Sequence, residues 1–211
     1  MTYTRLIGAF CNRIIVWIVQ GLSWAGIHPN VLTFVGLLIN IAAAAVLATG
    51  NFFNAGLVVT GAAIFDMVDG RVARETNQVT RFGGFFDSVL DRYSDLALLM
   101  GLLIYYANIN RPLYIILTAV VMTTSVMISY TRSRAENIIP KCKVGFMERP
   151  ERVVLLMIGT FFDKMAPVLW VIAVFGTVTV IHRIYYTFLE ARRLEEAQRV
   201  LTPLPESPAS R

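Results

Sequence analysis

The chain has 211 residues, of which 56% are hydrophobic and 16% are charged, and its formal net charge is +5 at pH 7. A mean hydropathy of +0.61 excludes an ordinary soluble domain and favours a one-domain protein that crosses a membrane several times. Two cysteines, Cys11 and Cys142, are too few for a disulfide framework or a zinc site.

The first 28 residues differ from the apolar spans that follow them. Polar side chains at positions 5, 12, 13 and 20 fall roughly along one side of a helix, with Ile, Phe and Trp opposite. This pattern predicts an amphipathic helix over residues 1–28 that lies on the inner surface of the membrane. The segment has no early apolar run of signal-peptide length, so we expect no cleavage.

Six apolar spans follow and predict an all-α fold with six transmembrane helices. The spans cover residues 31–49, 52–69, 84–107, 112–131, 153–162 and 166–188. Together they predict one transmembrane domain over residues 29–190. Residues 191–211 would form a cytoplasmic tail, and the Pro and Ser residues near its end predict partial disorder.

The basic residues lie mainly on one side of the predicted membrane. Of the 19 Lys and Arg residues, 16 lie on one side, counting those from Arg183 at the end of the last span onward. Arg92 lies inside a span, and the loops on the other side hold only Arg111 and Lys164. The positive-inside rule therefore predicts that both termini are cytoplasmic. The positive net charge follows from this topology, so it gives no reason to expect a nucleic-acid partner.

Aspartates collect near the ends of the second and third spans. Asp66 and Asp69 are three residues apart and share one helix face, while Asp87, Asp91 and Asp95 are spaced four apart on the next helix. The intervening segment is short enough for a hairpin. We therefore expect the two helices to direct four carboxylates toward one point near the cytoplasmic interface.

Carboxylates in a membrane are costly and repel one another, and a divalent cation relieves both effects. With no His or Cys nearby, all-oxygen ligands favour Mg²⁺ or Mn²⁺ over zinc. Small residues follow at Gly70, Ala73 and positions 83–84, and Arg74 offers a cation for phosphate. Two metal ions, small side chains and an arginine suit the binding of a pyrophosphate group, and two metals can hold the attacking and leaving oxygens of a displacement at phosphorus. Helix capping or charge balance would explain a single aspartate, but not the whole set at this spacing.

The run DMVDGRVAR, then eight residues, then GGFFDSVLD, from residue 66 to residue 91, resembles the signature of the CDP-alcohol phosphatidyltransferase family at every fixed position. The layout of six spans is similar as well. The resemblance implies that residues 29–190 are a catalytic domain, which transfers a phosphatidyl group from CDP-diacylglycerol to an alcohol and releases CMP. The metal ligands that it implies are Asp66, Asp69, Asp87 and Asp91, for two ions.

The resemblance also assigns Asp91 as the general base. A carboxylate beside the metals can accept the proton of a hydroxyl, but the sequence does not distinguish this role from that of a ligand alone. The nucleotide contacts that the resemblance implies are Asn30, Val31, Leu32, Thr33, Asp69, Gly70, Ala73, Arg74 and Thr80. Asn30 also suits a helix N-cap.

Four arginines flank the fourth and fifth spans, and glutamates are interleaved with them. They are Arg132, Arg134, Arg149 and Arg152. Flanking arginines can simply fix the topology, but this group also suits an anionic acceptor with several hydroxyls. The segments SYTRSRAE and GFMERPER resemble those of family members that use inositol phosphate, although Arg132 stands where Lys is expected. We therefore expect inositol phosphate as the acceptor, with glycerol phosphate as the alternative.

A transporter is the alternative of another class, because carboxylates within a membrane mark cation and proton pathways. The clustering of the acids at one interface disfavours it. The family resemblance further implies a homodimer in the cell membrane, although the sequence reveals no interface.

Overall fold

The computed structural model describes residues 29–75 and 78–201, apart from the side chains at positions 67, 69, 71–73, 75 and 199–201. These residues form six helices and no strand. The helices are α2 (Pro29–Ala48), α3 (Phe52–Glu75), α4 (Arg81–Asn108), α5 (Pro112–Ala135), α6 (Arg149–Phe161) and α7 (Met165–Leu201). The all-α prediction is confirmed for this part of the chain, and each helix corresponds to one predicted span.

Three helices are long and apolar enough to cross a membrane, namely α2, α5 and the Met165–Gln198 portion of α7. The apolar stretch of α3, Phe52–Asp66, is shorter. These helices identify an integral membrane protein, whereas six crossings stay a prediction. The predicted amphipathic helix lies outside the described residues. Helix α7 continues through residues 191–201, so the first part of the predicted tail is helical.

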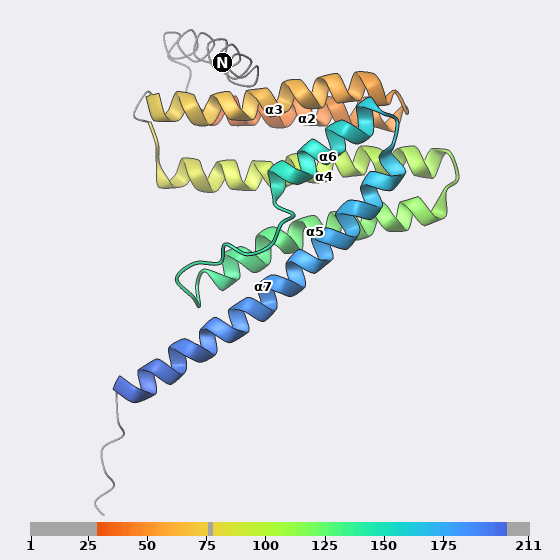
Figure 1. The fold of residues 1–211 in the computed structure, drawn as a ribbon. Helices are drawn as coiled ribbons and strands as arrows, with labels where there is room; N and C mark the ends of the chain where they lie inside the picture. Colours follow the sequence, from red (N-terminus) through yellow and green to blue (C-terminus); the bar gives the residue numbers. More distant parts are fainter. Residues whose placement is uncertain (1–28, 76–77, 202–211) are drawn as a thin grey trace, which may run out of the picture.

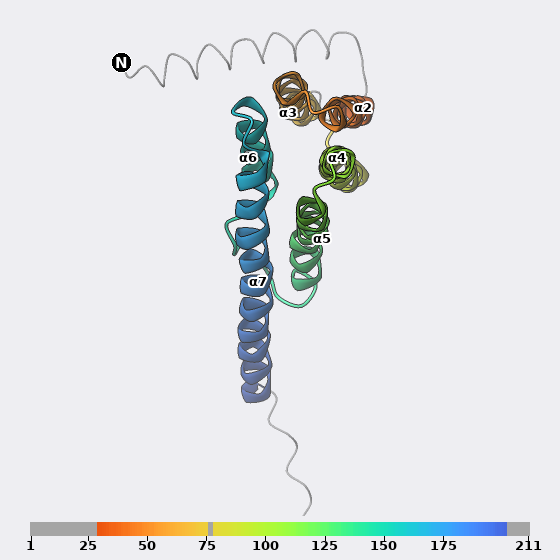
Figure 2. The ribbon, with the colours of Figure 1, turned by 90° about the vertical axis from the view of Figure 1, so that its right-hand side faces the viewer.

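Helix α2 lies against both α3 and α4 (Figures 1 and 2). Beyond these, α4 packs on α5, α5 packs on α7, and α6 lies against α3 and α7. Helices α3 and α4 run in opposite directions, as a hairpin requires, but each contacts α2 far more extensively than it contacts the other. Their aspartates are therefore brought together by side chains that extend between the helices.

Three tight turns join the helices at the end of the molecule opposite the aspartates of the motif at residues 66–91. Gly50, Asn110 and Asp163 adopt positive φ values of 81°, 52° and 52° in these turns. This left-handed conformation ends a helix, and Gly, Asn and Asp adopt it more readily than other residues. The turns reverse the chain, so that the end of α3 and the starts of α4 and α6 lie at the same end of the bundle (Figure 1).

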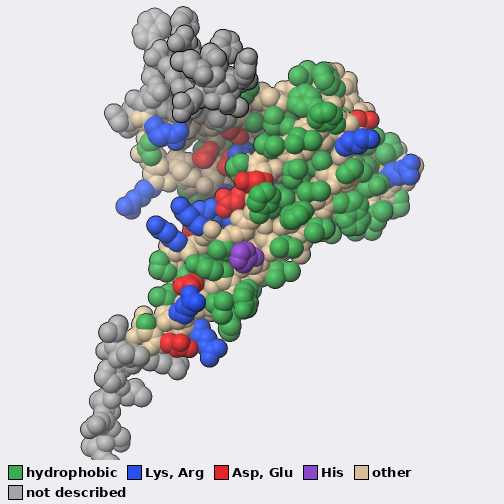
Figure 3. All heavy atoms as spheres, in the orientation of Figure 1, with side chains coloured by type: hydrophobic (Ala, Val, Ile, Leu, Met, Phe, Trp, Pro, Cys, Tyr) green, Lys and Arg blue, Asp and Glu red, His purple; other side chains and the backbone are tan. Residues whose placement is uncertain are grey.

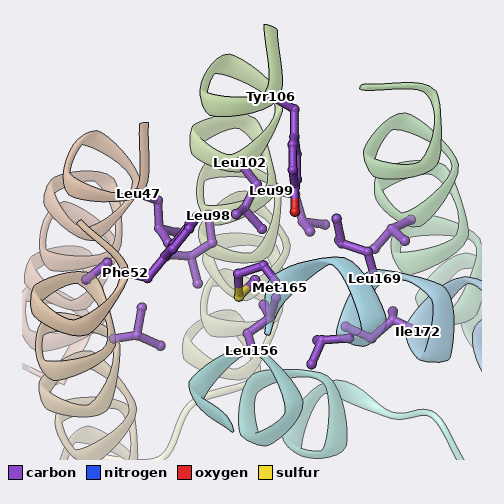
Figure 4. Close-up of a cluster of buried hydrophobic side chains, with 14 of the residues drawn as sticks. Leu47, Phe52, Leu98, Leu99, Leu102, Tyr106, Leu156, Met165, Leu169 and Ile172 are labelled. Carbon is purple, nitrogen blue, oxygen red and sulfur yellow. The ribbon is translucent and has the colours of Figure 1, made fainter. Parts of the chain in front are cut away.

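The core between the helices is aliphatic and aromatic (Figure 4). Leu98 of α4 and Leu169 and Ile172 of α7 are each at most 2% exposed. Helices α2 and α4 approach closely at Gly101, where an added Cβ would lie 2.3 Å from the carbonyl oxygen of Ala44. A larger residue at this position would push the helices apart. This contact fixes α4, and with it the aspartates, against α2.

Charged side chains are unevenly distributed over the surface. Figure 3 shows acidic and basic side chains gathered at the left and centre of the view and along the lower part of α7, with a few at the right edge, while hydrophobic side chains cover most of the remaining face. Large exposed hydrophobic residues include Phe53, Leu57 and Val174. An apolar outer surface of this extent suits contact with lipid.

Candidate active site

Asp66 lies within α3 and faces Gly36 of α2. An added Cβ on Gly36 would lie 2.9 Å from Asp66 Oδ1, closer than real Cβ atoms approach other atoms. Gly36 therefore leaves the space that this carboxylate occupies, and α2 forms one wall of the site. Sequence reasoning missed Gly36, because its role depends on the contact between α2 and α3 rather than on any local pattern.

Helix α4 carries the other aspartates of the motif, and a cap fixes where the helix begins. Thr80 is the N-cap residue, and its hydroxyl accepts a hydrogen bond from the backbone N–H of Gly83 at 2.9 Å. The helix then places Asp87 and Asp91 one turn apart on the same face. Asp66 of α3 and Asp91 of α4 both pair with one arginine, Arg149. The two helices therefore direct at least these two carboxylates toward one point.

One guanidinium joins the carboxylates of α3 and α4. Nη2 of Arg149 lies 2.6 Å from Oδ2 of Asp66, and its Nη1 lies 2.9 Å from Oδ1 of Asp91. Its Nε lies 3.4 Å from Oδ1 of Asp95. Because Arg149 is the first residue of α6, its long side chain extends from the end of that helix into the cluster. Three helices therefore meet at one positive charge.

The surroundings of Arg149 act on its pKa in opposite directions. Burial lowers the pKa of the guanidinium, but the carboxylates of the neighbouring aspartates raise it by more, so the pKa lies above its ordinary value. Arg149 is therefore always charged. Its charge offsets part of the repulsion among the carboxylates.

Asp66, Asp87 and Asp91 are also the expected metal ligands. Among the side chains that the structure describes, no group of three His, Cys, Asp or Glu residues is close enough together to hold a metal ion. The side chain of Asp69, the fourth expected ligand, is outside the described part of the chain. The donor set nonetheless fits Mg²⁺ or Mn²⁺, because it consists of carboxylate oxygens on two facing helices. The glycine at position 36 leaves room for the carboxylate of Asp66 against α2.

The expected nucleotide contacts on α2 lie at the start of that helix. Oδ1 of Asn30 lies 3.4 Å from the position of a Cβ on Gly83, so the starts of α2 and α4 meet. Val31 is exposed, whereas Leu32 and Thr33 are buried, and the Thr33 hydroxyl donates to the carbonyl four residues earlier at 3.2 Å. Helix α2 begins one residue before Asn30. Asn30 thus lies inside the first turn and not at the N-cap position that the sequence also suggested.

The expected nucleotide contacts on α3 are described only in part. Gly70 and Arg74 share a helix face, since a Cβ on Gly70 would lie 3.7 Å from Nη1 of Arg74. The side chains of Asp69 and Ala73 lie outside the described part of the chain. Thr80 is exposed to solvent, and its hydroxyl caps α4. The described residues therefore place a glycine, an arginine and a hydroxyl near the same end of the bundle as the aspartates.

The four arginines of the expected acceptor site separate into two sets. Arg149 and Arg152 join the aspartates, and Arg152, which is 4% exposed, forms an ion pair with Asp95. Asp95 itself is 6% exposed. Sequence reasoning assigned no role to Asp95, although its position four residues after Asp91 placed it on the same helix face.

The other two arginines lie at the end of α5. Arg134 is exposed, while Arg132 pairs with Glu136 at 3.1 Å and with Glu148 at 3.2 Å. Arg183 of α7, 1% exposed, also binds Glu148, at 2.8 Å, and donates to two backbone carbonyls. Sequence reasoning missed Arg183, and the available signal was a lone arginine within an apolar span. Glu148, the residue before Arg149, therefore connects the start of α6 to both α5 and α7.

The part of the chain that carries this site matches one protein family. Residues 26–190 match the CDP-alcohol phosphatidyltransferase family, and this range contains every site residue described above.

The chain belongs to the CDP-alcohol phosphatidyltransferase family. Membership accounts for the fixed spacing of the aspartates, and it favours an enzyme over the transporter that carboxylates in a membrane also suggest.

Within this family, the chain is similar to phosphatidylinositol phosphate synthases in both sequence and structure. The phosphatidylinositol phosphate synthase of Mycobacterium tuberculosis is 37% identical over 185 residues, which cover 82% of this chain and 85% of that protein. The crystal structure of a Mycobacterium tuberculosis phosphatidylinositol phosphate synthase with CDP-DAG bound matches with a TM-score of 0.78 and 33% identity, covering 83% of this chain and 94% of that one. Its crystal structure in complex with manganese and citrate matches with a TM-score of 0.76 at 33% identity, covering 82% and 88%.

Proposed function

We propose that this phosphatidyltransferase transfers the phosphatidyl group of CDP-diacylglycerol to a hydroxyl of inositol phosphate, giving phosphatidylinositol phosphate and CMP. One observation carries the proposal: Arg149 lies within 3 Å of both Asp66 and Asp91. A cation suited to an anionic acceptor therefore meets the carboxylates of the family motif. The 37% identity to a phosphatidylinositol phosphate synthase supports the choice of acceptor.

The motif aspartates are proposed to hold two divalent ions, Mg²⁺ or Mn²⁺. The proposed ligands are Asp66, Asp69, Asp87 and Asp91. When bound, such ions stabilise the negative charge that develops on the phosphate and on the leaving oxygen. The manganese in the related crystal structure supports a divalent metal.

Asp91 is proposed to accept the proton of the attacking hydroxyl. A hydroxyl is a poor nucleophile near neutral pH, and a partly exposed carboxylate can take its proton as the new bond forms. The Asp91 side chain is 25% exposed, and Arg149 orients one of its oxygens at 2.9 Å. In the alternative, Asp91 is only a metal ligand, and Asp91→Asn would then lose metal affinity in proportion to activity.

The cytidine diphosphate is proposed to bind where the starts of α2 and α4 meet the end of α3. The residues assigned to it are Asn30, Val31, Leu32, Thr33, Asp69, Gly70, Ala73, Arg74 and Thr80. Glycines at this position allow a phosphate to approach the backbone closely. The guanidinium of Arg74 can bind two phosphate oxygens at once.

The acceptor phosphate is proposed to bind on the side of α6, at Arg132, Arg134, Arg149 and Arg152. The Arg149 side chain is 26% exposed and can contact a soluble anion, whereas the Arg152 side chain is only 5% exposed. We therefore assign direct contact to Arg149 and an indirect effect to Arg152. Inositol phosphate offers several hydroxyls to the glutamates nearby, while glycerol phosphate would leave more of these groups unpaired.

The membrane arrangement completes the proposal. All six helices cross the cell membrane, with both termini in the cytoplasm, because most of the basic residues lie on that side. Residues 29–190 form the catalytic domain, between the juxtamembrane segment 1–28 and the tail 191–211. The chain functions as a homodimer, as the family resemblance implies.

A product assay tests the proposed function. Purified protein in detergent receives radiolabelled CDP-diacylglycerol and Mg²⁺, together with inositol phosphate or glycerol phosphate in parallel reactions. We expect a higher kcat/KM for inositol phosphate. A clear preference for glycerol phosphate would contradict the acceptor assignment, and the absence of CMP release with either acceptor would contradict the transferase activity itself.

A further inference from the structure

Asp95 lies one helical turn beyond Asp91 on α4, and it faces two arginines of α6. One of its carboxylate oxygens pairs with Nη2 of Arg152. The other lies 3.4 Å from Nε of Arg149. A single carboxylate thus contacts both arginines at the start of α6, yet Asp95 is not part of the motif that spans residues 66–91.

The pair formed by Asp95 and Arg152 is deeply buried, since these residues are 6% and 4% exposed. Arg152 also donates to the carbonyl of Met147 at 3.5 Å. A buried ion pair adds little net stability relative to apolar residues of similar volume, because removing two charges from water offsets most of their attraction. Stability alone therefore gives a weak reason for these charges, and their geometric effect is the stronger one.

That effect concerns how α6 is held relative to α4. Helix α6 packs on α3 and α7, and its described ion pairs with α4 are those of Arg149 and Arg152 with Asp91 and Asp95. Arg149 directs its two Nη atoms at Asp66 and Asp91, while its Nε faces Asp95. The Nε of Arg149 makes no hydrogen bond within the described part of the chain, so Asp95 acts on this guanidinium through its charge at 3.4 Å, while Nη2 donates to Asp66. The charge of Asp95 therefore holds Arg149 beside the motif carboxylates.

We propose that Asp95 is a positioning residue for the acceptor side of the active site, which holds Arg149 and Arg152 in register with Asp91 and binds neither metal nor nucleotide. The inference rests on the proposed function, because the arginines that Asp95 positions are those assigned to the acceptor phosphate. It predicts that loss of the Asp95 charge weakens acceptor binding selectively.

The variant Asp95→Asn tests this in full-length protein purified in detergent. We expect the KM for inositol phosphate to rise about tenfold or more, as for a lost charge-assisted contact. The KM for CDP-diacylglycerol and the Mn²⁺ affinity, measured by calorimetry, should stay at their wild-type values. Asp66→Asn serves as the metal-ligand comparison. Asp163→Asn, in the turn between α6 and α7, is the matched control, because the same chemical change there should alter none of these constants.

Because Asp95→Asn leaves Arg152 buried without its charged partner, a second variant separates positioning from folding. Asp95→Leu combined with Arg152→Met replaces both charges with apolar side chains, and it should restore thermal stability. The inference predicts that the acceptor KM of this double variant stays raised, because Arg149 has lost its anchor.

Two outcomes would overturn the inference. Wild-type acceptor KM in the folded double variant would show that the pair is only structural, and a loss of Mn²⁺ affinity in Asp95→Asn equal to that in Asp66→Asn would make Asp95 a metal ligand. If wild-type protein prefers glycerol phosphate, the proposed acceptor fails, but the same comparison with glycerol phosphate still tests Asp95.

Discussion

Gly36 permits a sharp test of the site, because adding one methyl group there should displace Asp66, a proposed metal ligand, without harming the fold. The Cβ of Gly36→Ala would lie 2.9 Å from Asp66 Oδ1, whereas ordinary van der Waals contacts begin at 3.4 Å. The carboxylate must therefore move by about 0.5 Å to restore an ordinary contact. It is held at 2.6 Å by Arg149, so the movement also disturbs that ion pair.

The expected magnitude follows from this displacement. A misplacement of about 1 Å costs roughly 100-fold in rate, so half of that distance predicts a loss of about tenfold in kcat. Mn²⁺ affinity should fall as well, because ligand orientation controls metal binding. Stability should not fall, since alanine within a helix is favoured over glycine by about 1 kcal/mol.

Transfer activity, Mn²⁺ calorimetry and thermal unfolding, all on detergent-purified protein, check this prediction. Gly61→Ala on α3 is the matched control, because a Cβ at Gly61 meets no atom within 4 Å and the variant should retain full activity. Normal kcat and normal Mn²⁺ affinity in folded Gly36→Ala protein would refute the proposed contact between α2 and the metal site.

Further variants address the remaining parts of the site. Asp91→Asn and Asp66→Asn should each abolish CMP release, and wild-type turnover by Asp91→Asn protein would contradict both roles proposed for it. Gly70→Leu should prevent CDP binding while the fold is retained, because the added side chain fills the space proposed for the nucleotide; unchanged affinity in a CDP titration would remove Gly70 from the site. Arg134→Ala should raise the KM for inositol phosphate by about tenfold or more and leave the KM for CDP-diacylglycerol unchanged, whereas normal kinetics would reduce this arginine to a topology signal. Arg152→Ala should raise the same acceptor KM and also lower the unfolding free energy by about 3–5 kcal/mol, because it leaves a buried carboxylate unpaired; a thermal melt equal to that of wild type would contradict the buried ion pair.

The helices, and the meeting of aspartates from two of them, could be predicted from local patterns. Each described helix corresponds to an apolar span, because a long apolar run in a membrane satisfies its backbone only as a helix. Asp66 and Asp91 could be assigned to one site because the spacing of the motif places each on a defined helix face, and the short link between α3 and α4 returns the chain to the same end. The predicted hairpin does not rest on packing between its two helices, since each packs far more extensively against α2.

The amino-acid sequence by itself determined the helical class, the membrane association and which helix faces carry the aspartates, because these depend on hydropathy and on periodic spacing along one chain. Only the tertiary structure separated Arg149, which joins the carboxylates, from Arg132, which pairs with glutamates. Both arginines flank apolar spans, so the sequence does not distinguish them. They differ because the start of α6 faces the aspartates of α3 and α4, whereas the end of α5 faces glutamates. The same reason applies to Asp95 and Gly36. The role of a buried carboxylate is decided by the cations across from it, and that of a glycine by the atom that occupies the space of its missing side chain.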